Sequence, residues 1–141
     1  MRIDRLFLFL TLSTLLATAP LRAADESAAA NAVAAVLDDF HDAADKGDKA
    51  RYLGHFTEDG VFLGTDDWER WPLPVFRDYV GKRFRDGKGW SYRAVERHVR
   101  VAADGETAWF DEIVESPKWG RFRGTGVLLR RGDQWKVAHY A

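Results

Sequence analysis

The sequence contains no cysteine, so the chain can form neither structural disulfides nor a cysteine-linked lipoprotein anchor. It also lacks a glycine-rich phosphate loop, a Gly-x-Ser-x-Gly nucleophile elbow and a His-Glu-x-x-His zinc motif. We therefore expect no metal and no cofactor. Acidic and basic side chains are nearly balanced, 22 against 21, which does not favour nucleic-acid binding.

The first 23 residues have the pattern of a secretory signal peptide, with a charged start, an apolar run and small residues ending at Ala23. The apolar run, Leu6 to Ala19, is too short for a comfortable membrane span, so a membrane anchor is the weaker alternative. We expect cleavage after Ala23, with Ala19 as the second choice. The remaining domain, residues 24–141, would be periplasmic or secreted, free of the membrane, with a net charge of about −3.

Hydrophobic spacing predicts three helices in the first part of this domain. The first runs from an N-cap at Ser27 to Gly47, and Asp48 caps a second, shorter helix. A third helix occupies residues 72–84, after a short strand in "GVFLG" and a polar loop, "GTDDWERW". The first helix is expected to bury one face, formed by Val33, Val36, Leu37, Phe40 and Ala44, and to keep His41 near the surface.

From Trp90 onward the hydrophobic period changes from about 3.6 to 2, which predicts an antiparallel meander of four strands. Turn residues separate the four runs, which occupy residues 90–101, 107–116, 120–130 and 134–141. Asp104-Gly105 and Gly132-Asp133 are strong hairpin signals, and Pro117 to Trp119 is a looser one. Helices followed by such a meander predict one α+β domain.

The segments "DKGDKARYLGHFTEDGVFLGTDDWERW", "AWFDE", "GTGVLL" and "WKVAHY" resemble the SnoaL-like branch of the nuclear transport factor 2-like superfamily. The resemblance covers roughly Ala32 to Ala141. It implies helices packed in a strongly curved, cone-shaped antiparallel sheet that encloses a cavity. The superfamily includes polyketide cyclases, steroid isomerases, dehydratases and transport factors, so the fold does not select a reaction.

The two clear hairpin turns, with an even middle loop closing Glu115 on Phe122, predict the register of the sheet. In that register one row crosses four strands and faces the cavity: His98, Asp111, Gly126 and His139. Asp111 and His139 are the predicted catalytic pair, because a carboxylate and an imidazole can transfer protons. The structural alternative is that Asp111 only pairs with a histidine; Glu112 is interpreted as a structural partner of Arg97.

The other predicted site residues lie on the same face or at the cavity mouth. Trp71 would close the cavity, Thr65 would hold the loop before it, and the set of ligand-binding residues comprises His98, Trp71, Trp109, Ile113, Leu128 and Thr65. These residues predict a site for a small apolar or aromatic molecule. The alternative function is a cofactor-independent isomerase, cyclase or dehydratase using Asp111 and His139.

A third hypothesis is an interaction module with a vestigial cavity. The opposite sheet face is expected to carry an apolar patch of Val99, Phe110, Val127 and Leu129, which predicts a homodimer.

Overall fold

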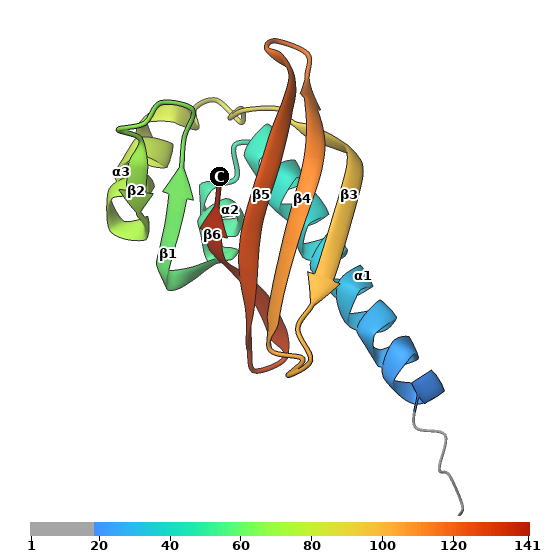
Figure 1. Cartoon of the computed structure of the whole chain (residues 1–141). Coiled ribbons are helices and arrows are strands. Elements are labelled where there is room, and N and C mark those ends of the chain that lie inside the picture. The colour runs from blue at the N-terminus through green and yellow to red at the C-terminus, as the bar shows by residue number, and fades with distance from the viewer. Residues whose placement is uncertain (1–18) are drawn as a thin grey trace, which may run out of the picture.

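The computed structural model describes residues 19–141 and contains three helices and six strands within them (Figure 1). In chain order they are α1 (Ala19–Asp45), α2 (Lys49–Gly54), β1 (Phe56–Leu63), β2 (Arg70–Pro72), α3 (Leu73–Arg83), β3 (Arg93–Val101), β4 (Thr107–Ser116), β5 (Gly120–Arg131) and β6 (Gln134–Tyr140). The α+β prediction is confirmed. Residues 1–18, most of the predicted signal peptide, lie outside the described part of the chain, so that prediction stays open.

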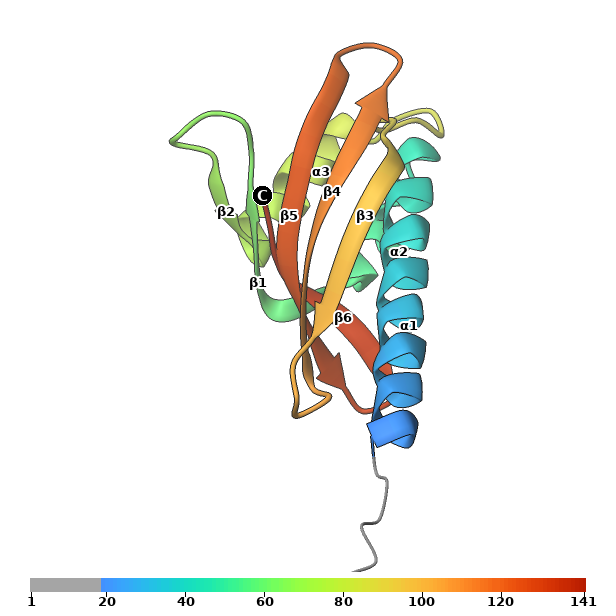
Figure 2. The ribbon, with the colours of Figure 1, turned by 45° about the vertical axis from the view of Figure 1, so that its right-hand side comes forward.

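Helix α1 lies along the sheet beside β3 and extends past it at the helix N-terminus (Figure 2). Four of the five residues of its predicted buried face, Val33, Leu37, Phe40 and Ala44, are at most 2% exposed, and the fifth, Val36, is partly buried against the core. The helix begins before Ser27 rather than at it, because an alanine-rich segment favours helix without a cap there. It ends as predicted at Gly47, whose φ of +64° is a left-handed conformation that glycine tolerates.

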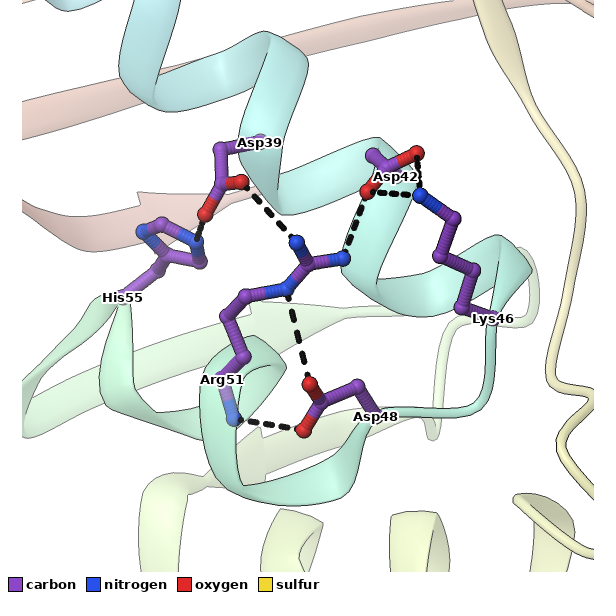
Figure 3. Close-up of polar contacts among 6 residues, drawn as sticks. All are labelled: Asp39, Asp42, Lys46, Asp48, Arg51 and His55. Carbon is purple, nitrogen blue, oxygen red and sulfur yellow. Dashed lines mark hydrogen bonds and ion pairs between the residues drawn. The ribbon is translucent and has the colours of Figure 1, made fainter.

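A polar cluster joins α1 to α2 (Figure 3). Arg51 of α2 reaches two carboxylates of α1, with 3.2 Å to Asp39 and 2.6 Å to Asp42. His55, just after α2, lies 2.8 Å from the other oxygen of Asp39. Asp48 caps α2 as predicted, since its side chain accepts from the backbone N–H of Arg51 at 3.1 Å. These contacts fix the short helix α2 against α1.

The sheet has the strand order β2-β1-β6-β5-β4-β3 and is mixed. All neighbouring pairs are antiparallel except β1 and β6, which are parallel, so the prediction of a purely antiparallel sheet is wrong for this pair. The meander starts at the β3 edge and returns through β6 to lie beside β1, in the same direction as β1. The predicted strong curvature and cone shape stay a prediction.

The first hairpin has the predicted register, with Arg97 opposite Glu112 and His98 opposite Asp111. The middle register is wrong by one residue, because Ser116 pairs with Gly120 around the three-residue turn 117–119. Gly120, the strand residue directly after this turn, has a φ of +85°, a left-handed conformation that glycine tolerates. Asp111 therefore faces Thr125, and Gly124 faces Glu112.

In the third hairpin Leu128 faces Val137 as predicted, but a register shift follows. It places His139 opposite Val127 and Tyr140 opposite Gly126, so the predicted pair Gly126–His139 is wrong. A one-residue shift reverses which face each later side chain occupies. Tyr140 consequently takes the inner position, toward the helices, that the sequence predicts for His139.

The segment "GTDDWERW" is the turn of a hairpin between β1 and β2 rather than a plain loop. The carboxylate of Glu69 accepts hydrogen bonds from the backbone N–H groups of Thr65 and Asp66, with N–O distances of 2.8 and 3.2 Å. Gly64 is required beside it, because a Cβ atom there would overlap the Glu69 side chain. Trp68 is 70% exposed at the tip, whereas Trp71 is half-buried in β2.

Candidate ligand pocket

A pocket of about 280 Å³ lies between α1, the β1–β2 hairpin, the segment before β3 and the chain end after β6. Its lining is mostly aromatic, with rings contributed by Phe40, Tyr52, Phe62, Trp71, Tyr79, Trp90, Tyr92, Trp119, Phe122 and Tyr140. Polar side chains are few. This composition is typical of small-molecule sites, although the volume is at the low end of the usual range of about 300–1,000 Å³.

Several of these rings are nearly parallel. Phe62 lies 3° from parallel to Tyr140, with ring centroids 5.5 Å apart, and 13° from parallel to Trp71 at 6.1 Å. Trp71 in turn stacks on Tyr79 at 4.3 Å. A set of parallel rings offers flat apolar surfaces, which favour a flat ligand that stacks against them.

A buried polar network reaches the pocket through His41 and Tyr140 and centres on Glu112, which lies behind the lining and is 1% exposed. His41 Nε2 lies 2.7 Å from Glu112 Oε1, and the Tyr140 hydroxyl donates to the same oxygen at 3.1 Å. The Arg97 Nε atom donates to Glu112 Oε2 at 2.8 Å. Arg97 also pairs with Asp38 of α1 at 2.7 Å, so its positive charge is shared between two carboxylates.

These partners decide the protonation of the network. Burial raises the pKa of Glu112, but the hydrogen bond from His41 and the charges of His41 and Arg97 outweigh burial, so the pKa lies below the usual 4.5. Burial, and then the Glu112 charge, raise the pKa of Tyr140 well above 10.0. Near neutral pH Glu112 is therefore an acceptor and Tyr140 a donor. Because an ionised carboxylate only accepts, His41 Nε2 carries the shared proton.

Glycine at position 124 makes space for this network. A Cβ atom on Gly124 would lie 2.5 Å from the Tyr140 hydroxyl and 3.1 Å from Glu112 Cγ. The missing side chain at Gly124 therefore allows Tyr140 and Glu112 to approach each other over β5.

The predicted row of His98, Asp111, Gly126 and His139 does not form. Asp111 is exposed on the outer face of the sheet, and His98 is exposed and bonds Glu96 at 2.9 Å. His139 also falls on the outer face, beside Val127. The row fails for two reasons. The turn between β4 and β5 shifts their pairing by one residue relative to the prediction, and the register of β6 shifts before His139. The catalytic roles of Asp111 and His139 stay a prediction that has lost its geometric basis.

The predicted ligand-binding residues separate into two groups. Trp71 and Thr65 line the pocket, as predicted for its mouth. Trp109 is 49% exposed on the outer face, and Ile113 shares that face, so neither reaches the pocket in this structure. Leu128 is fully buried in the core rather than part of the pocket lining.

The sequence interpretation missed His41 and Tyr140 as pocket residues, and it missed Glu112 as the buried partner of both. His41 is 7% exposed, not near the surface as predicted. Its position four residues after Leu37, on the buried face of α1, indicated burial. The glycine that ends "PKWG" indicated a three-residue turn. A turn of that length pairs Glu112 with Gly124, so that both face the inner side of the sheet.

Two further classes of site can be addressed within residues 19–141. No group of three or more His, Cys, Asp or Glu side chains there is arranged to hold a metal ion. None of the described helices is long and apolar enough to cross a membrane.

The sequence profile of the SnoaL-like domain matches residues 33–141. The chain belongs to the SnoaL-like domain family. This match covers the whole pocket, since every lining residue lies within it. A search of curated proteins found no match.

Solved structures confirm the nuclear transport factor 2-like fold of this SnoaL-like domain. A nuclear transport factor 2-like protein of unknown function from Pseudomonas putida KT2440 superposes with a TM-score of 0.68 at 14% identity, covering 81% of this chain and 84% of its own. A candidate dehydratase of the same fold family from Streptomyces avermitilis gives 0.64 at 15% identity, with 81% and 94% covered. A candidate scytalone dehydratase from Novosphingobium aromaticivorans gives 0.59 at 15% identity, with 78% and 79% covered.

Proposed function

We propose that this SnoaL-like domain binds a small, flat, largely aromatic molecule in the pocket. The observation that carries the proposal is the lining of nearly parallel rings, in which Phe62 stacks with both Trp71 and Tyr140. Aromatic faces that are not covered by protein gain contact and lose water when a flat ring stacks on them. A volume of about 280 Å³ favours a molecule of one or two rings.

The test is a mass-spectrometric search for small molecules released when the purified protein is denatured. Thr65→Trp places a large side chain at a pocket-lining position of an exposed turn, so this variant should release little or no ligand. Asp67→Trp is the matched control, because Asp67 lies in the same turn, is exposed and does not line the pocket. Equal recovery from both variants would place the bound molecule elsewhere.

A second candidate function is proton-transfer catalysis with His41 as the base. When the ring is neutral, the hydrogen bond from Nε2 to ionised Glu112 leaves Nδ1 as the nitrogen that can accept a proton, and Nδ1 has no hydrogen-bond partner among the described side chains. His41 also lines the pocket. A carboxylate that orients a histidine is a recurrent arrangement for general base catalysis. The candidate dehydratases with this fold make a proton-transfer reaction a reasonable class to test.

Deuterium exchange from D2O into 1-tetralone would test this function, because protons next to a carbonyl exchange under base catalysis. His41→Asn should remove any exchange above the rate in buffer, and His139→Asn, on the outer face, should retain it. Loss of exchange only in the His139 variant would instead restore the site predicted from the sequence. Absence of exchange in the unaltered protein would leave binding as the function.

We also infer export to the periplasm, which rests on the sequence of residues 1–23. Residues 24–28 are exposed, so the new N-terminus left by cleavage after Ala23 would begin with side chains at the surface. Intact mass of protein from a Gram-negative host should show a chain about 23 residues shorter than the translated sequence. Full retention of the N-terminus would contradict export with cleavage.

A further inference from the structure

Exposed basic side chains are concentrated on one side of the pocket, on a surface that we call the basic rim. It consists of residues 82–93, which connect the end of α3 to the start of β3, and residues 115–123, which include the turn between β4 and β5. Both segments lie at the same end of the molecule in both views (Figures 1 and 2). Its eight basic side chains are all exposed: Lys82, Arg83, Arg85, Lys88, Arg93, Lys118, Arg121 and Arg123.

The net charge of the basic rim is opposite in sign to that of the rest of the domain. The rim has only two acidic residues, Asp86 and Glu115, so its net charge is +6. The remainder of residues 24–141 has ten basic and 19 acidic side chains, a net charge of −9. Glu115 lies between two of the rim arginines, 3.2 Å from Arg93 and 3.5 Å from Arg121. A negative surface would therefore attract the rim, repel the rest of the domain and so orient the molecule.

Aromatic side chains are exposed within the basic rim. Trp119 is 49% exposed and Phe122 is 38% exposed. The ring of Tyr92 lies 6.0 Å from that of Trp119 and 5.9 Å from that of Phe122, and the ammonium group of Lys118 lies 4.7 Å from the Trp119 ring. Tryptophan beside basic groups is typical of surfaces that contact a bilayer, because the ring lies among the headgroups and the cations attract anionic lipids.

This arrangement fits a flat anionic surface better than a strand of nucleic acid. A strand follows a positive groove over several nucleotides, whereas here the positive charge is confined to one end and the remainder of the domain is negative. A flat surface needs to contact only that end of the molecule (Figure 2). Tyr92, Trp119 and Phe122 also line the pocket, so contact through the rim would place the pocket next to the surface.

We propose that the basic rim docks this protein reversibly on an anionic lipid bilayer, with Trp119 and Phe122 at the level of the headgroups. The inference goes beyond the proposed binding function and does not depend on it. It differs from the expectation that the mature domain is free of the membrane, because docking at the surface needs no spanning segment. An apolar ligand dissolved in the bilayer would then reach the pocket without crossing water.

Co-sedimentation of the purified protein with lipid vesicles tests the proposal without any pocket ligand. Vesicles of phosphatidylcholine with about 30 mol% phosphatidylglycerol should bind the protein about tenfold more tightly than phosphatidylcholine alone, and about 0.5 M salt should remove most of this preference. Lys88→Glu combined with Lys118→Glu should weaken binding to the mixed vesicles about tenfold or more. Arg130→Glu combined with Arg131→Glu makes the same change of charge at the opposite end of the sheet and should alter binding less than about twofold. All variants carry the same residues 1–23, so any contribution of that segment is common to them.

A fluorescent label locates the contact. The chain has no cysteine, so Pro117→Cys places a single environment-sensitive fluorophore in the basic rim and Asp133→Cys places one in the exposed turn between β5 and β6 at the opposite end. Mixed vesicles should shift the emission of the label at position 117 to shorter wavelength and leave the label at position 133 unchanged.

The proposal is overturned if the protein shows no preference for the mixed vesicles, if the two pairs of charge substitutions weaken binding equally, or if the label at position 133 shifts as much as the label at position 117. Binding of a single-stranded oligonucleotide of about 20 thymidines in place of the vesicles would also overturn it, and would assign the basic rim to nucleic acid. Because no pocket ligand is present, these results leave the proposed binding function to its own test.

Discussion

Two neighbouring carboxylates of β4 lie on opposite faces of the sheet and have opposite surroundings. Glu112, on the inner face, is 1% exposed and bonds His41, Arg97 and Tyr140. Asp111, on the outer face, is exposed and has no side-chain partner among the described residues. The comparison shows that burial and partners, rather than residue type or nearness in sequence, decide which carboxylate can orient a histidine.

The largest expected effect comes from Glu112→Gln, which keeps the shape of the side chain and removes its charge. Arg97 would then be buried against a neutral amide, and breaking such a pair costs roughly 3–5 kcal/mol. Asp111→Asn, the matched change on the outer face, should stay within about 0.5 kcal/mol. Urea unfolding measures both. Equal losses would mean that the two faces do not differ as the structure indicates.

Adding one methyl group at Gly124 should give the next largest effect. Gly124→Ala places a Cβ atom against the Tyr140 hydroxyl and Glu112, and overpacking of this kind costs about 1–3 kcal/mol. Gly81→Ala is the control, because a Cβ atom there meets nothing within 4 Å and alanine favours helix α3. The control should be neutral or stabilising by up to about 1 kcal/mol. A Gly124 variant as stable as the control would contradict the close packing of the network.

The outer face is expected to form a homodimer, although not through the residues first predicted. Phe110 is 2% exposed on the inner face and Val99 packs against the core, so the predicted patch with Val127 and Leu129 is not one surface. Trp109, 49% exposed and opposite Val127, is the better anchor. Trp109→Ser should weaken dimerisation by about tenfold or more, measured by light scattering over a dilution series. A monomer at every micromolar concentration of unaltered protein would remove the dimer prediction.

The smallest expected effect is a difference in pH dependence. The pKa of Glu112 is lowered in the folded protein, so its ionised form stabilises the fold above about pH 4.5, and this stability is lost as the pH falls through the lowered value. In the Glu112→Gln variant, the free energy of unfolding should decrease less between neutral and acidic pH than it does in the unaltered protein. Asp111→Asn should follow the unaltered protein. If the Glu112→Gln variant loses stability as steeply as the unaltered protein, other carboxylates carry the loss.

The three helices and five of the six strands of the described residues could be predicted from the sequence because hydrophobic spacing and turn residues act locally; β2 was predicted as part of a loop. The register of the first hairpin followed from Asp104-Gly105, whose turn type sets the pairing of Arg97 with Glu112. The α+β class followed from the order of these elements. The parallel pairing of β1 with β6 joins segments far apart in the chain, and no local signal specified it.

The site could be predicted only in part, because small register errors reverse the faces of a strand. Trp71 and Thr65 were placed correctly at the pocket, since a hairpin turn next to a helix lies at an open end of the sheet. Asp111 and His139 were each one residue away from the side chains that point inward, Glu112 and Tyr140. The register shift before His139 has no turn residue to mark it, so tertiary packing alone determines it.

The four histidines offer the most direct test of the claim that the site lies on the inner face. Nitrogen–proton spectra of protein with labelled histidines would be recorded during a titration with 1-tetralone. The ring signals of His41 should shift and saturate, while those of His98 and His139 on the outer face stay unchanged. Saturable shifts of His98 or His139 with His41 unaffected would contradict the account and place the ligand on the outer face.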